Sequence, residues 1–143
     1  MKKSDYLHGQ FCWVDLQTTD TEAAKKFYTS LIGWDFLDVP TDRGPVYTMF
    51  QHDGLSTAGM GPMPPDMKAA GMPPVWSSYV YVTDAEATVA KAAELGATVL
   101  MPVMKVMDQG WLAFLQDPSG AAFGLWQPNQ HKGAEWVNSV GGF

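Results

Sequence analysis

The chain contains the same short pattern twice. An alternating run that ends in Thr-Asp occurs at residues 13–20, WVDLQTTD, and again at residues 77–84, SSYVYVTD. Each run leads into an alanine-rich segment, and the closing residues Asp20 and Asp84 lie 64 positions apart. A repeat of this length indicates two copies of one supersecondary unit, each too small to bury a core alone. The fold is therefore restricted to two similar halves, whose matched positions can be compared.

Both halves have the same predicted order of elements. In the first, an alternating strand leads into a helix that Thr19 or Asp20 caps and that Gly33 ends. In the second, a similar strand precedes a helix from Asp84 to Gly96. The predicted strands cover residues 12–18, 34–39, 46–50, 55–60, 75–82, 97–101, 111–116 and 121–127. Each half is therefore βαβββ, and the first helix should pack on its sheet through Ala23, Ala24, Phe27, Tyr28 and Leu31.

We expect a single domain over residues 1–143, because a chain of this length can bury one core. Module one covers about residues 10–61, and module two covers residues 75–127. Residues 62–74 are rich in proline and are predicted to be a linker. The tail, residues 128–143, is polar and glycine-rich, and no regular structure is expected there.

Composition excludes some classes of partner. A net charge of −6 argues against nucleic-acid binding, which needs clustered Lys and Arg. No apolar run is long enough to span a membrane, and the single cysteine, Cys12, cannot form an internal disulfide. These features predict a cytoplasmic protein with no membrane partner. The six tryptophans and nine methionines favour an apolar pocket or an oligomer interface.

Two further motifs carry a family resemblance. FYTSLIGW follows the first helix start at residues 27–34, and DPSGAAFGLWQ closes the second module at residues 117–127. With the repeated βαβββ order, these motifs resemble the vicinal oxygen chelate superfamily of glyoxalases, bleomycin-resistance proteins and extradiol dioxygenases. The resemblance implies an α+β fold in which two βαβββ modules form a cupped, incomplete barrel around the site. The sequence is most similar to a bacterial glyoxalase-like group whose members often carry two such domains. Because the group often fuses two domains, the resemblance implies a homodimer.

The resemblance also implies where a metal would bind. Metal-dependent members place one ligand on the first strand of each module and one near the end of each last strand. Counting from the repeat and from the turn glycines, the first-strand positions are Trp13 and Ser77, and the last-strand positions are Ala58 and Gly124. None of these side chains is a good metal ligand. We therefore predict no metal and no other cofactor.

Strand alternation predicts what lines the cup instead. The expected ligand-binding residues are Trp13, Asp15, Gln17, Ser77, Tyr79, Tyr81 and Trp126. The last strands of the two modules are expected to add Ser56, Ala58, Met60 and Gly124 to the same face. Aromatic walls, small residues and a few polar groups suit a planar, partly apolar small molecule.

Asp15 is the candidate catalytic residue. A carboxylate that faces an aromatic cavity could act as a general base or bind a cationic group. The alternative is a structural carboxylate, hydrogen-bonded to Tyr79 or Tyr81. The sequence favours a metal-free protein that binds an aromatic or cationic small molecule. Two other hypotheses stay open: a metal-independent lyase or isomerase that uses Asp15 or a cup tyrosine as acid or base, and a regulatory or assembly module.

Overall fold

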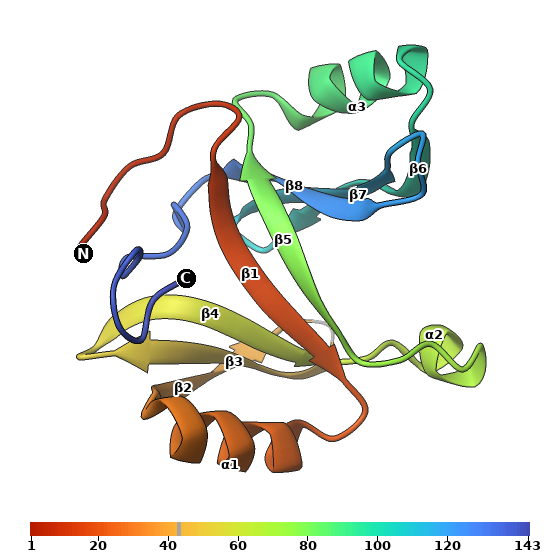
Figure 1. Cartoon of the computed structure of the whole chain (residues 1–143). Coiled ribbons are helices and arrows are strands. Elements are labelled where there is room, and N and C mark those ends of the chain that lie inside the picture. Colours follow the sequence, from red (N-terminus) through yellow and green to blue (C-terminus); the bar gives the residue numbers. More distant parts are fainter. Residues whose placement is uncertain (43) are drawn as a thin grey trace. The chain divides into compact units, whose positions relative to one another are not determined.

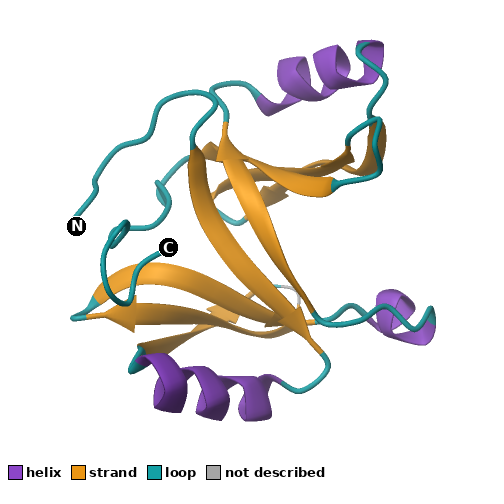
Figure 2. Ribbon diagram, viewed as in Figure 1, coloured by secondary structure: helices purple, strands orange, loops and turns teal. Residues whose placement is uncertain are grey.

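The computed structural model describes residues 1–42 and 44–143, so Arg43 lies outside the described residues. The described residues form eight strands and three helices, which follow one another along the chain (Figure 1). In order they are β1 (Phe11–Thr18), α1 (Thr21–Ile32), β2 (Asp35–Thr41), β3 (Gly44–His52), β4 (Leu55–Pro62), α2 (Pro65–Ala69), β5 (Val75–Tyr81), α3 (Ala85–Glu94), β6 (Thr98–Val106), β7 (Gly110–Gln116) and β8 (Ala122–Pro128). The βαβββ order occurs twice, and the predicted α+β class is confirmed (Figure 2).

The chain divides into two compact units. Unit 1 contains residues 1–4, 14–76 and 134–143, and unit 2 contains residues 5–13 and 77–133. Strand β1 contributes its first three residues to unit 2 and the rest to unit 1. The predicted linker contains the short helix α2, which sequence analysis did not anticipate, and the predicted tail supplies residues to both units.

The sheet of unit 1 has the strand order β2-β3-β4-β1, and α1 covers one face of it (Figure 1). The core on that face consists of Leu16, Phe50, Ala58 and Met60, with Ala24 and Tyr28 of α1 packed against it. Leu16 therefore points away from the predicted site, as the alternation of β1 requires.

Two expectations for unit 1 are wrong. Ala58 and Met60 lie in the core beneath α1 and not on the opposite, site-bearing face. Phe27 and Leu31 were expected to be buried, yet their exposed fractions are 56% and 66%. The apolar stripe of α1 is wider than the surface that the four-stranded sheet covers, so only part of it is buried.

Unit 2 has the strand order β5-β8-β7-β6, with α3 against one face. Its core contains Val82, Ala85, Ala113, Leu115 and Leu125. Val89 and Ala92 of α3 pack on this cluster, so each unit buries one sheet face under one helix.

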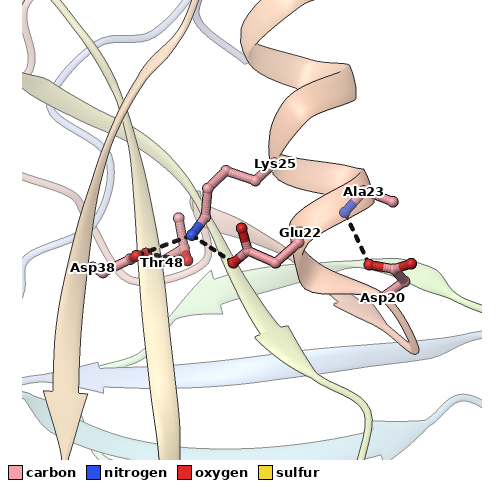
Figure 3. A network of polar contacts seen from close by, with 6 residues as sticks. All are labelled: Asp20, Glu22, Ala23, Lys25, Asp38 and Thr48. Carbon is pink, nitrogen blue, oxygen red and sulfur yellow. Dashed lines mark hydrogen bonds and ion pairs between the residues drawn. The ribbon is translucent and has the colours of Figure 1, made fainter.

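Matched aspartates begin the two long helices. Asp20 accepts a hydrogen bond from the backbone N–H of Ala23 at 2.9 Å (Figure 3). Asp84 accepts one from Ala87 at the same distance. Each carboxylate satisfies a helix N–H that has no partner within the helix. The repeated Thr-Asp of the sequence is therefore a repeated N-cap.

A polar network joins α1 to β2 and β3 on the helix-covered side of unit 1 (Figure 3). Lys25 Nζ lies 2.9 Å from Asp38 Oδ2 and 3.1 Å from Glu22 Oε1. Thr48, which is 3% exposed, donates its hydroxyl to Asp38 Oδ1 at 2.7 Å. The hydrogen bonds from Thr48 and then Lys25 lower the pKa of the Asp38 carboxyl.

Among the residues that the structure describes, no helix has the length and apolar character needed to cross a lipid bilayer.

The network predicts a pH-dependent contribution to stability. Thr48→Val should lower the free energy of unfolding at pH 7 by about 1 kcal/mol, because it removes a partly buried hydrogen bond to a carboxylate. A lowered folded-state pKa gives stability that is present above the unfolded pKa of about 4 and is lost as the pH falls through the folded value. The difference between the two proteins should therefore shrink below about pH 4.

Urea titrations from pH 7 to pH 2.5 measure this difference. Thr98→Val, at an exposed position of β6, is the matched control and should change the free energy of unfolding little at any pH. A Thr48→Val effect of constant size across the range would contradict the assignment.

Candidate functional site

Asp15 lies on the face of the unit 1 sheet that α1 does not cover. It is 9% exposed, and Tyr47 of β3 donates its hydroxyl to Asp15 Oδ2 at 3.2 Å. One group that contacts Asp15 is therefore a tyrosine that the sequence did not indicate, contributed by a strand of the same unit.

Gly59 makes room for Tyr47. It is the register partner of Asp15 in the parallel pairing of β1 and β4, so the two positions share a face. A Cβ atom built on Gly59 would overlap the Tyr47 hydroxyl, and one on Gly61 would lie 3.5 Å from Tyr47 Cδ2. The two glycines of β4 form a floor beneath the tyrosine ring.

The register corrects one predicted metal position. Asp15 pairs with Gly59 in unit 1 as Tyr79 pairs with Gly124 in unit 2, and Asp15 and Tyr79 occupy matched positions of the repeat. Gly59, not Ala58, is therefore the counterpart of Gly124. In the pairing of β3 with β4, Phe50 pairs with Ala58 and Gln51 with Ser56, so Thr57 is an extra, unpaired residue of β4. Because of this extra residue, counting from the turn glycine gives a position one residue too early.

Tyr79 covers Gly124 in unit 2. A Cβ atom on Gly124 would lie 2.6 Å from Tyr79 Cε1, which no ordinary side chain allows. The Tyr79 ring is 4% exposed and packs edge-on against Phe114 of β7, with 5.3 Å between ring centroids. At both matched positions, therefore, a tyrosine ring lies where a longer side chain on the last strand would project.

The same face of unit 2 carries two tryptophans and a histidine. Trp126 lies over Gly110, where a Cβ atom would come within 2.6 Å of the indole Cζ2. Trp13 contacts His131 edge to face, with ring centroids 4.5 Å apart, and Trp126 contacts the same imidazole at 5.7 Å. His131 lies in the predicted tail, and nothing in its local sequence marks it as a site residue.

The remaining predicted site residues are half-buried. Tyr81 is the register partner of Trp126, and its ring stacks on Tyr6 at 6.4 Å between centroids. Gln17 pairs with Gly61, and Ser77 begins the part of β5 that belongs to unit 2. The structure therefore groups Asp15 and Gln17 with Tyr47 in unit 1, and Tyr79, Tyr81 and Trp126 with Trp13 and His131 in unit 2.

The donor set of the family's metal positions does not fit a metal. With the corrected register these positions are Trp13, Gly59, Ser77 and Gly124, which offer one hydroxyl and no imidazole, thiolate or carboxylate. Over residues 1–42 and 44–143, no group of three or more His, Cys, Asp or Glu side chains is arranged to hold a metal ion. We therefore assign no step to a metal at these positions.

Cys12 does not supply a nucleophile. The thiol is fully buried and contacts the Tyr79 carbonyl oxygen at 3.5 Å. Burial raises its pKa to about 12, so the reactive thiolate is scarce at neutral pH.

The glycine–tyrosine contacts predict unequal costs for added methyl groups. Gly124→Ala should lower the free energy of unfolding by about 3 kcal/mol, because the buried Tyr79 ring has little room to shift. Gly59→Ala should cost less, about 1–2 kcal/mol, because the half-buried Tyr47 can move aside at the expense of its hydrogen bond to Asp15.

Gly44→Ala is the control, since a Cβ atom there has nothing within 4 Å and the backbone is not left-handed. Thermal and urea unfolding of the three variants give the order of the effects. Equal losses in all three variants would show that glycine flexibility, and not ring contact, determines the cost.

Comparison with known proteins agrees with the fold. The family model described as "Glyoxalase/Bleomycin resistance protein/Dioxygenase superfamily" matches residues 10–125. CFP32 of Mycobacterium tuberculosis, provisionally named a glyoxylase, is 49% identical over 141 residues, which cover 98% of this chain and 54% of CFP32. Anthracycline biosynthesis protein DauV of Streptomyces sp. strain C5 is 34% identical over 91% of this chain and 51% of its own length. The chain spans about half the length of these curated relatives.

Solved structures show the same fold at lower identity. Methylmalonyl-CoA epimerase from Mycobacterium tuberculosis has a TM-score of 0.61 at 17% identity, covering 90% of this chain and 93% of the epimerase. The Mn(II)-bound glyoxalase from Novosphingobium aromaticivorans has a TM-score of 0.57 at 16% identity, covering 92% of this chain and 42% of that protein. Because the family model matches most of this chain, residues 10–125, the chain belongs to the glyoxalase/bleomycin resistance protein/dioxygenase superfamily.

Proposed function

We propose that this chain is a metal-free binding domain for a planar aromatic or cationic small molecule. The observation that carries the proposal is the pair of glycines, Gly59 and Gly124, each filled by a tyrosine ring where relatives would need a ligating side chain. The ligand-binding residues in this proposal are those assigned from the sequence: Trp13, Asp15, Gln17, Ser77, Tyr79, Tyr81 and Trp126.

The aromatic content of these positions supports a planar ligand. Indole and phenol rings offer large, rigid surfaces that favour stacked and edge-on contacts with other rings. They also attract cations through the negative potential of the ring face. One relative, at 34% identity, is named as an anthracycline biosynthesis protein, and anthracyclines contain planar fused rings. This name supports the ligand class without identifying the ligand.

Asp15 supplies the charge in this proposal. The carboxylate is nearly buried, so water screens it little. Tyr47 donates its hydroxyl to Asp15 Oδ2 and so helps to fix the orientation of the carboxylate. A cationic group on the ligand would therefore find a fixed counter-charge.

A second function is favoured by one specific observation. The 3.2 Å contact between Tyr47 and Asp15 joins a hydroxyl to a carboxylate, which is the pairing that general acid–base chemistry uses. A metal-independent lyase or isomerase that uses Asp15 or a cup tyrosine as acid or base is therefore the alternative. In that case Tyr47→Phe should alter the pH profile of turnover, whereas a binding protein has no turnover to alter. The homodimer stays a prediction.

Benzamidine and benzamide test the charge assignment, because they have nearly the same shape and only benzamidine is cationic at pH 7. Asp15→Asn should weaken benzamidine binding roughly tenfold, which corresponds to about 1.4 kcal/mol, and leave benzamide binding unchanged. Isothermal titration calorimetry measures both affinities. Asp66→Asn, an exposed aspartate of α2, is the control and should change neither. Equal weakening of both probes by Asp15→Asn would show that the carboxylate acts through structure alone.

Metal analysis tests the other half of the proposal. Protein purified without chelator should contain well under one equivalent of any transition metal. Added Zn²⁺, Ni²⁺ or Mn²⁺ should leave the melting temperature unchanged, because ligand binding to the native state alone would raise it. A stoichiometric metal that survives gel filtration would overturn the metal-free assignment.

A further inference from the structure

Two tryptophan side chains in unit 2 contact the same histidine ring of the chain. Trp13 and Trp126, here called the indole box, are 5% and 7% exposed. The His131 imidazole lies against both, at centroid distances of 4.5 and 5.7 Å and interplanar angles of 86° and 65°. His131 itself is half-buried and lies in a segment without regular structure. The two indoles thus both contact one ring, and that ring comes from the protein.

The box is held in place by contacts that do not involve the imidazole. The Trp126 ring lies against the backbone at Gly110, and its Nε1–H donates to the His131 carbonyl oxygen at 2.8 Å. The backbone N–H groups of Asn129 and His131 both donate to the Gln109 carbonyl oxygen, at 2.8 and 3.1 Å. The backbone around His131 is therefore anchored by bonds other than the contacts between its imidazole and the two indoles.

The chemistry of the occupant indicates what the box can bind. Burying an imidazole removes water from its polar ring nitrogens, a cost that an apolar ring of similar size would avoid. Indole rings compensate in part, because their faces and edges interact favourably with heteroaromatic rings and with cations. A box that accepts an imidazole in the folded state is suited to another planar heteroaromatic ring.

We propose that the indole box is a binding site for a planar heteroaromatic ring and that His131 is its built-in occupant, which a ligand must displace. The proposal rests on the proposed function and deepens it: it names the ligand class and adds His131 as the residue that competes with the ligand. Removal of the His131 side chain then removes the competitor and strengthens binding, opposite to the effect of removing an ordinary contact residue.

Free imidazole is the probe. His131→Ala leaves a ring-sized space between the two indoles, and it should bind imidazole at least tenfold more tightly than the wild-type chain does. Tryptophan fluorescence and thermal shift report the binding. His131→Phe, which refills the box with an apolar ring, should lose this gain. His52→Ala is the matched control, because His52 stacks on Trp136 in unit 1, at 5.0 Å between centroids, and its removal leaves the indole box closed.

The outcomes separate this inference from the proposed function. Equal imidazole affinity in wild type, His131→Ala and His131→Phe overturns the inference, whether or not the protein binds benzamidine. A gain for His131→Ala together with no benzamidine binding to the wild type supports the box and overturns the charge-directed function. An NMR titration of the wild type with imidazole does not depend on a variant that folds. The His131 ring signals and the Trp126 indole N–H signal should shift, and unchanged signals at high imidazole concentration overturn the displacement.

Discussion

Close contact between glycine backbone and an aromatic ring determines the packing on the uncovered sheet face of each unit. Tyr47 lies over Gly59, Tyr79 over Gly124, and Trp126 over the backbone at Gly110. A glycine in a strand weakens the strand and leaves a gap, and a ring on a neighbouring strand fills that gap. Each contact between a glycine and a ring holds a large side chain close to the sheet. The orientations of the aromatic rings are therefore fixed.

With this packing, the positions that hold metal ligands in metal-dependent relatives carry no ligating side chains in this chain. Family membership implies the repeated βαβββ architecture, but function depends on the groups at particular positions. At the positions where metal-dependent relatives need ligands, this chain has a tryptophan, a serine and two glycines, and the glycines are already occupied by phenol rings. The residues that remain suited to chemistry or recognition are Asp15 with Tyr47 in one unit and the indole box in the other.

Several elements could be predicted from local sequence because local physics determines them. The aspartates that end the repeated Thr-Asp motif cap their helices, since a carboxylate there accepts a helix N–H whatever the rest of the chain does. The alternation of β1 places Leu16 under α1 and Asp15 on the opposite face. The exposure of Phe27 and Leu31 could not be predicted in this way, because it depends on how much of α1 the sheet covers.

The sequence by itself determined the duplicated order of elements, the helix caps and the alternation of residue types along β1, because these follow from spacing within a few residues. Tertiary structure decided three things. One extra residue at Thr57 made Gly59 the counterpart of Gly124. Register between strands brought Tyr47 to Asp15, 32 positions away in sequence. The path of the tail placed His131 against Trp13. Contacts of this kind depend on where distant segments meet, and neither composition nor periodicity contains that information.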